Sequence, residues 1–173
     1  MAEGIFHEFA LPDDPFLDRF CSGYAPTDRY FRSREWFKAD KGRSSPPTYV
    51  FRVAERGPVV GYCAIAFRKQ PHPDDAHATK ARYLVIYMIG VDLPFQGIQN
   101  PLTPGQTYAA SIMAVLEGMA RAKPDCVGLS LWARSTNAVA MAFYRKVGFA
   151  EDPGGPSQRD GGDPLLTMRK ILT

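Results

Sequence analysis

The sequence predicts an α+β domain built around a mixed, mostly antiparallel sheet flanked by about four helices. Short runs of Val, Ile, Leu and aromatic residues recur along the chain and are typical of strands. Two of these runs are joined by the turn Glu55-Arg-Gly-Pro58, which indicates an antiparallel hairpin. Two later segments have helical spacing and alternate with strands. Together these patterns favour helices packed on one mixed sheet.

Length and composition predict one domain over residues 1–173. The chain has 45% hydrophobic and 23% charged residues, which is ordinary for a soluble globular protein, and it contains no internal repeat or linker. No apolar run reaches the roughly 18 residues that span a membrane, and the first residues do not resemble a signal peptide. The cysteines Cys21, Cys63 and Cys126 form no metal-like cluster. We therefore expect a cytoplasmic protein with reduced thiols, no membrane partner and no metal.

The N-terminal third is predicted to hold one strand and two short helices. Residues Ile5 to Leu11 have weak strand character. From Asp14 to about Asp40 the apolar spacing is helical, with interruptions at Gly23 and Pro26. Residues Lys41 to Pro47 carry Gly, Ser and Pro and are predicted to form a loop.

The middle of the chain is predicted to form three strands. Residues 48–54 and 59–67 are the two arms of the hairpin, and residues 83–91 are the most apolar strand, hence the expected centre of the sheet. The polar residues 70–80 between them are predicted to form a surface loop.

The last third alternates helix and strand. Residues 107–122 have helical spacing, residues 126–132 are a strand, and a short strand is expected after Gly148. A Pro- and Gly-rich loop is expected at 153–164, and residues 165–171 should close the sheet.

The segment from Asn137 to Phe149 is the most informative in the chain. It predicts a short helix that Ser135 or Thr136 can cap and that Gly148 ends in a left-handed conformation. Asn137 and Tyr144 are seven residues apart, so they share one helix face. Such an amide and phenol can hold a ligand and give it a proton. The alternative is an ordinary amphipathic helix with a half-buried tyrosine.

This segment resembles the last motif of the GNAT acyltransferases, in which an asparagine and an alanine-rich helix precede Tyr-x-x-x-Gly-Phe. The matching residues are Asn137, Ala138, Ala140, Ala142, Tyr144, Gly148 and Phe149. The resemblance implies a sheet that splays after its fourth strand and receives the pantetheine arm of acetyl-CoA. It also implies roles: Tyr144 as general acid, Asn137 orienting the cofactor arm, and amides of Ile89, Gly90 and Val91 holding the acyl carbonyl. No general base is assigned, and a water can do this work.

The stretch Val91 to Gly97 resembles the start of the GNAT phosphate-binding motif but departs from it afterwards. The second and third glycines are missing at the usual spacing, and Pro101 and Pro104 remove amide donors. Either the longer loop still delivers amides to the pyrophosphate, or it binds CoA weakly or not at all. The residues expected to supply these contacts are Gln96, Gly97, Ile98, Gly105, Gln106 and Thr107.

The resemblance implies an acetyl-CoA-dependent N-acetyltransferase that acts on a primary amine of a small molecule or macromolecule. The sequence does not identify this amine and leaves the oligomeric state open, a homodimer included. A different class of function is a non-catalytic GNAT-fold module that binds a ligand or partner. The altered residues 98–106 favour this alternative, and the retention of Asn137 and Tyr144 disfavours it.

A more specific version is a toxin that acetylates aminoacyl-tRNA. The run from Phe20 to Arg32 resembles the Phe-x-Cys-Gly pattern of GNAT toxins. Residues 29–43 hold six basic and two acidic side chains, a balance of about +4, with four aromatic residues interleaved. Such a mixture can bind tRNA. The alternative is a solvated basic face with its aromatic side chains in the core.

Overall fold

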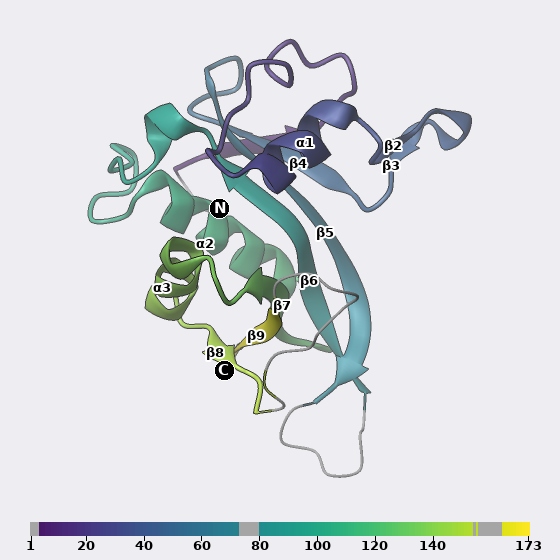
Figure 1. Cartoon of the computed structure of the whole chain (residues 1–173), viewed down its shortest axis with the longest axis vertical. Coiled ribbons are helices and arrows are strands. Elements are labelled where there is room, and N and C mark those ends of the chain that lie inside the picture. The colour runs from purple at the N-terminus through teal and green to yellow at the C-terminus, as the bar shows by residue number, and fades with distance from the viewer. Residues whose placement is uncertain (1–3, 73–79, 154, 156–163) are drawn as a thin grey trace. The chain divides into compact units, whose positions relative to one another are not determined.

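The computed structural model describes residues 4–72, 80–153, 155 and 164–173, and its main feature is a seven-stranded mixed sheet (Figure 1). In sheet order the strands are β1 (Phe6–Phe9), β4 (Thr48–Arg52), β5 (Val59–Pro71), β6 (Lys80–Val91), β7 (Cys126–Arg134), β9 (Leu165–Ile171) and β8 (Ala150–Glu151). β6 and β7 run parallel, whereas β1 with β4, β4 with β5, β7 with β9 and β8 with β9 run antiparallel. The predicted α+β class and mostly antiparallel sheet are confirmed.

The helices of the described residues are close in number to the four predicted but differ in place and type. They comprise three α-helices and two 3-10 helices: α1 (Ala25–Ser33), η1 (Ala39–Lys41), η2 (Leu93–Phe95), α2 (Tyr108–Arg121) and α3 (Ala138–Lys146). The prediction of two helices between Asp14 and Asp40 was wrong. Turns occupy most of residues 12–19, and a two-stranded sheet of β2 (Phe37–Lys38) and β3 (Arg43–Ser44) follows α1.

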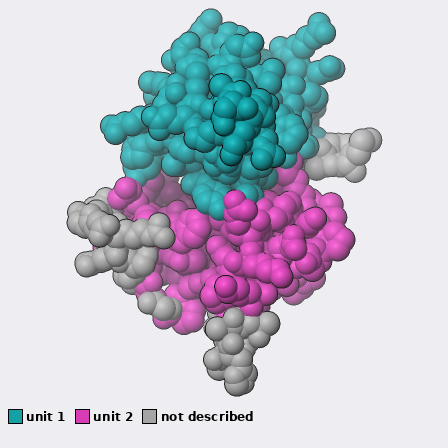
Figure 2. Space-filling model, turned by 90° about the vertical axis from the view of Figure 1, so that its right-hand side faces the viewer, with its two compact units in different colours: residues 1–66, 87–115 teal, residues 67–86, 116–173 magenta. Residues whose placement is uncertain are grey.

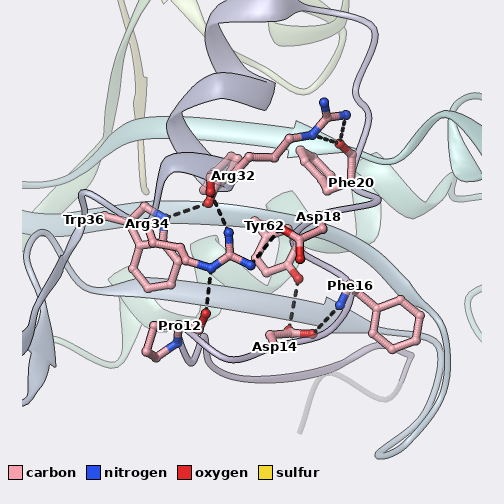
Figure 3. A network of polar contacts seen from close by, with 10 residues as sticks. Pro12, Asp14, Phe16, Asp18, Phe20, Arg32, Arg34, Trp36 and Tyr62 are labelled. Carbon is pink, nitrogen blue, oxygen red and sulfur yellow. Dashed lines mark hydrogen bonds and ion pairs between the residues drawn. The ribbon is translucent and has the colours of Figure 1, made fainter.

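Arg34 explains why α1 stops early. Its backbone adopts a left-handed φ of 59°, which ends the helix after Ser33. The Arg34 guanidinium donates to the carbonyl of Pro12 at 2.7 Å and to the carboxylate of Asp18 at 2.9 Å (Figure 3). These contacts connect the end of α1 to the turn that precedes it in the chain, a tertiary effect that helical spacing does not report.

The order of the last strands also differs from the prediction. β9 lies between β7 and β8, so β8 is the edge and β9 does not close the sheet. β9 pairs with β7 over seven residue pairs, from Gly128↔Ile171 to Arg134↔Leu165. The two-residue β8 adds only Ala150↔Arg169 and Glu151↔Met168, and such a short strand suits an exposed edge.

Pairing between the fourth and fifth strands of the sheet stops halfway. The parallel register runs from Arg82↔Cys126 to Ile86↔Leu131, although β6 continues to Val91 and β7 to Arg134. Among the described residues this is the arrangement predicted for a sheet that splays after its fourth strand.

The chain forms two compact units, residues 1–66 with 87–115 and residues 67–86 with 116–173 (Figure 2). We call them unit 1 and unit 2. The expectation that residues 1–173 act as one domain stays a prediction. The core of unit 1 lies around α1 and contains Ala10, Leu17, Phe20, Phe31, Trp36, Val50, Val59 and Tyr62. In unit 2, one sheet face buries Leu84, Leu129, Leu131 and Met168, which alternate along their strands as a sheet core requires.

Candidate functional site

The predicted site residues divide between the two units. Residues 89–91, 96–98 and 105–107 belong to unit 1, and Asn137 and Tyr144 belong to unit 2. We therefore describe a cofactor half in unit 1 and a catalytic half in unit 2, each by itself.

The end of β6 is closely packed against the start of the α1 region. A Cβ atom on Gly90 would lie 2.6 Å from Cγ2 of Thr27 and 2.8 Å from Cζ of Phe20. A Cβ on Gly61 of β5 would lie 2.3 Å from the carbonyl oxygen of Gly90. Glycine at both positions therefore lets β5 and the side chains of Thr27 and Phe20 approach the end of β6 closely. Ile89 and Val91, on either side of Gly90, are partly buried.

Gln96 holds the turn after β6 in place. Its Nε2 donates to the carbonyl of Ser22 at 2.7 Å and to that of Val91 at 2.8 Å. Asp92 supports the same junction, because its carboxylate accepts from the amide of Cys21 at 2.9 Å. The sequence singled out Gln96 as a cofactor ligand and gave no role to Asp92. Asp92 comes directly after an apolar strand and two residues before Pro94, a position at which an aspartate often stabilises a turn.

The enlarged loop after Gly97 is an ordered turn. Gln99 and Thr107 form an antiparallel bridge. The backbone amide of Asn100 donates to the carbonyl of Gln106 at 2.8 Å, and the backbone amide of Tyr108 donates to the carbonyl of Ile98 at 3.1 Å. The bridge brings the two halves of the predicted phosphate site, 96–98 and 105–107, next to each other.

Asn100 fixes the interior of this loop, and the sequence did not identify it. Its side chain is 1% exposed. Nδ2 donates to the carbonyl of Gly4 at 2.7 Å and to Oγ of Ser111 at 3.0 Å, and Oδ1 accepts from the amide of Leu102 at 3.0 Å. Asn100 thus joins the N-terminal segment, the loop and α2.

The amides expected to hold phosphate fall into two groups. Those of Gln96, Ile98 and Gln106 donate within the loop, to Leu93 at 3.2 Å, Phe95 at 3.4 Å and Thr103 at 3.0 Å. Within residues 4–72, 80–153, 155 and 164–173, no hydrogen bond is made by the amides of Gly97, Gly105 and Thr107. Gly97 and Gly105 have φ values of 70° and 83°, which glycine adopts without strain. Three of the six amides are therefore available to an anion.

Thr107 stands at the start of α2. Its Oγ1 accepts from the amide of Ala110 at 3.3 Å, and the helix begins at Tyr108, one residue after the predicted start. The positive end of the α2 dipole therefore lies beside the available Thr107 amide, an arrangement that favours a bound anion.

In unit 2, the capping prediction for the helix from Asn137 was wrong. Asn137 itself is the N-cap of α3, because its Oδ1 accepts from the amide of Ala140 at 3.1 Å, in place of Ser135 or Thr136. The cap uses only the oxygen of the amide, and its Nδ2 group remains a donor. At the other end of α3, Gly148 has a φ of 95°, which confirms the predicted left-handed stop.

Tyr144 lies in the last turn of α3 and is partly buried. Its ring centroid is 5.6 Å from that of Phe143 and 5.9 Å from that of Phe149, and its carbonyl accepts from the Phe149 amide at 2.9 Å. Burial raises the pKa of Tyr144 to about 12. A phenol with its usual pKa of about 10 is already protonated at neutral pH, so burial only makes Tyr144 hold this proton more tightly.

The basic and aromatic segment from Arg29 to Arg43 packs largely as the structural alternative predicted. Phe31 and Trp36 are fully buried, and Tyr30 and Phe37 pack against the same core. Arg32 donates to the carbonyl of Phe20 (Figure 3). Phe31 and Trp36 are therefore core residues and are not available for stacking on bases.

The described residues contain no candidate metal site and no candidate membrane-spanning helix. No group of three or more His, Cys, Asp or Glu side chains there could hold a metal ion. All three cysteines are free. In the same part of the chain, no helix is long and apolar enough to cross a membrane.

Comparisons with known proteins agree with this architecture. The model of the acetyltransferase (GNAT) family matches residues 14–149. A bacterial toxin structure is 16% identical with a TM-score of 0.66, over 98% of this chain and 91% of its own. AtaT complexed with acetyl-methionyl-tRNAfMet is 16% identical with a TM-score of 0.60, over 94% and 93%. A putative phosphinothricin N-acetyltransferase is 18% identical with a TM-score of 0.55, over 98% and 99%. No curated protein sequence matches significantly.

Proposed function

Because the chain belongs to the acetyltransferase (GNAT) family, we propose that it transfers an acetyl group from acetyl-CoA to a primary amine by direct attack. The observation that carries the proposal is the place of Tyr144, a partly buried phenol in the last turn of α3. It occupies the tyrosine position of the family motif and is protonated when the reaction needs an acid.

Acetyl-CoA supplies the acetyl group as a thioester. The amides of Ile89, Gly90 and Val91 hold the acyl oxygen while the amine nitrogen bonds to the carbonyl carbon. As the carbon–sulfur bond breaks, Tyr144 gives its phenolic proton to the departing sulfur. The attacking nitrogen loses its proton to water, and water returns a proton to the Tyr144 phenolate.

The cofactor half fits a pyrophosphate with fewer donors than the usual glycine-rich turn. The unused amides of Gly97, Gly105 and Thr107 and the N-terminus of α2 provide positive potential. The amides of Gln96, Ile98 and Gln106 support the loop instead. Asn137 is assigned to the cofactor arm through its Nδ2 group, since its oxygen caps α3.

Titration of acetyl-CoA into the purified chain tests the cofactor half, with melting temperature and calorimetry as readouts. Saturation at about one hundred times the dissociation constant should stabilise the fold by about 2.7 kcal/mol. Absence of binding at millimolar acetyl-CoA would overturn the enzyme assignment and favour the non-catalytic binding module.

Tyr144→Phe tests the catalytic half. Loss of a general acid should lower kcat by a factor of about 10² to 10⁴ and leave the affinity for acetyl-CoA nearly unchanged. Tyr49→Phe is the matched control, since it removes another partly buried phenol, on β4. An unchanged kcat in Tyr144→Phe would refute the assignment of the acid.

Charged tRNA is the second candidate acceptor. AtaT, of similar fold, has been solved with acetyl-methionyl-tRNAfMet, and Lys41 and Arg43 are exposed cations of the basic segment. Contacts with phosphates predict that binding falls steeply as salt rises. A weak salt dependence of acceptor binding would exclude tRNA in favour of a small amine.

A further inference from the structure

A hollow of about 270 Å³ lies beside α1 in unit 1 and has no role in the chemistry described above. Its lining comes from one face of α1, from Glu35 two residues beyond the end of the helix, and from one side chain of β6. The lining residues are Pro26, Arg29, Tyr30, Ser33, Glu35 and Met88. The volume is just below the usual range of small-ligand sites, so the hollow suits a molecule of about amino-acid size.

The hollow carries two opposite charges that the fold does not use. Arg29 and Glu35 are exposed, and within the described residues neither side-chain charge has a hydrogen bond or ion pair. They also do not pair with each other, although both line the same hollow. By contrast, Arg34 of the same segment forms an ion pair with Asp18 and contacts two carbonyls (Figure 3).

The apolar part of the lining favours a ligand with an apolar body. Met88 and Tyr30 are partly buried, and Pro26 adds a third apolar surface. An anion facing Arg29, a cation facing Glu35 and an apolar body between them describe a zwitterion. A ligand with a single charge could pair with only one of these two exposed side chains.

The hollow is also close to the part of β6 to which we assign the acyl oxygen. Met88 precedes Gly90 by two residues on β6, so both side-chain positions face the same side of the strand. Thr27 of α1 contacts both: its Oγ1 donates to Sδ of Met88 at 3.6 Å, and its methyl group adjoins Gly90. The Thr27 side chain therefore separates Met88, and with it the hollow, from Gly90.

We infer that this hollow binds the acetyl acceptor as a small zwitterion, with Glu35 facing its ammonium group and Arg29 facing its carboxylate or phosphate. The role of the bound zwitterion as acetyl acceptor rests on the proposed function, whereas its binding in the hollow does not require acetyl transfer. Arg29 and Glu35 are then the residues that determine specificity.

Calorimetry with the full chain in the presence of CoA tests the inference without acetyl transfer. The probes are L-methionine and L-leucine, their amides, which lack the carboxylate, and their N-acetyl forms, which lack the ammonium group. The free amino acids should bind tightest. Arg29→Gln should lower their affinity about three- to tenfold and remove the preference over the amides, and Glu35→Gln should remove the preference over the N-acetyl forms.

Matched controls and a charge reversal sharpen the test. Arg43→Gln and Asp40→Asn remove exposed charges that do not line the hollow and should bind all probes as the unaltered chain does. Arg29→Glu should reverse the preference and favour the amides. Equal binding of the three ligand forms, or insensitivity to both Arg29→Gln and Glu35→Gln, would overturn the inference.

The design separates this inference from the proposed function. Tyr144→Phe should bind the zwitterions normally, because Tyr144 does not line the hollow. Binding without acetyl transfer in the unaltered chain would count against the proposed function alone. Acetyl transfer that ignores Arg29 and Glu35 would count against the zwitterion site alone.

Discussion

Burial controls the protonation of Tyr144. The surrounding protein raises its pKa from 10 to about 12 by disfavouring the charged phenolate. The phenol of the folded chain thus holds its proton more tightly than that of the unfolded chain. Its contribution to stability is fully present below pH 10 and is lost as pH rises toward 12.

Alkaline unfolding measures this contribution. Between about pH 9 and pH 12, the free energy of unfolding of the unaltered chain should fall by about 2 to 3 kcal/mol more than that of Tyr144→Phe. The comparison of the two proteins cancels the other tyrosines, lysines and cysteines that titrate in this range. Parallel curves for both proteins would mean that Tyr144 ionises in the folded state without cost.

At the scale of an element, α3 combines a structural and a proposed chemical role in one side chain. Asn137 caps the helix through Oδ1 and retains Nδ2 for a ligand. Asn137→Ala should destabilise the chain by about 1 kcal/mol, as measured by denaturant unfolding. Asn137→Asp keeps a capping oxygen and removes the donor, so it should keep stability and weaken acetyl-CoA binding. Normal acetyl-CoA affinity in Asn137→Asp would assign the residue to capping alone.

The loop between η2 and α2 depends on Asn100 in a similar way. Asn100→Ala would remove all three hydrogen bonds of this buried side chain, to Gly4, Ser111 and Leu102. We expect a loss of about 2 to 3 kcal/mol in the free energy of unfolding. Gln99→Ala, an exposed neighbour on the same loop, is the control and should change stability by less than about 0.5 kcal/mol. Equal stability of the two variants would show that the loop does not rely on Asn100.

Across the molecule, unit 1 depends on a buried carboxylate that joins distant segments. Asp14 accepts from Oη of Tyr62 at 3.0 Å (Figure 3). It also accepts from the guanidinium of Arg52 at 3.1 Å, and its side chain is 4% exposed. Burial, and then the Asp14 charge, raise the pKa of Tyr62, which keeps this phenol a donor. The network fastens the N-terminal turn to β4 and β5.

Removal of this carboxylate should therefore affect the whole unit. Asp14→Ala is expected to lower the free energy of unfolding by about 3 kcal/mol, since it leaves the Arg52 charge partly buried with one fewer partner. Asp18→Ala is the control: its side chain is 73% exposed and its ion pair with Arg34 contributes at most about 1 kcal/mol. Similar unfolding midpoints for the two variants would contradict a structural role for Asp14.

The sequence alone determined the elements whose signals are local. Apolar runs located β4, β5, β6, β7 and β9, and Gly148 marked the end of α3, because strand character and left-handed turns depend on a few neighbouring residues. The motif from Asn137 to Phe149 indicated the family for the same reason. The proton-donating role of Tyr144 was predicted from that motif and remains to be tested.

Tertiary structure decided the features that depend on distant partners. Arg34 ended α1 through Pro12 and Asp18, and β9 rather than β8 paired with β7. Asn100 stabilises the loop through hydrogen bonds to Gly4, which is distant in the sequence, and to Ser111, which lies on α2. Which loop amides stay available, and which two charges line one hollow without pairing, follow from hydrogen bonds and side-chain positions that no sequence window contains.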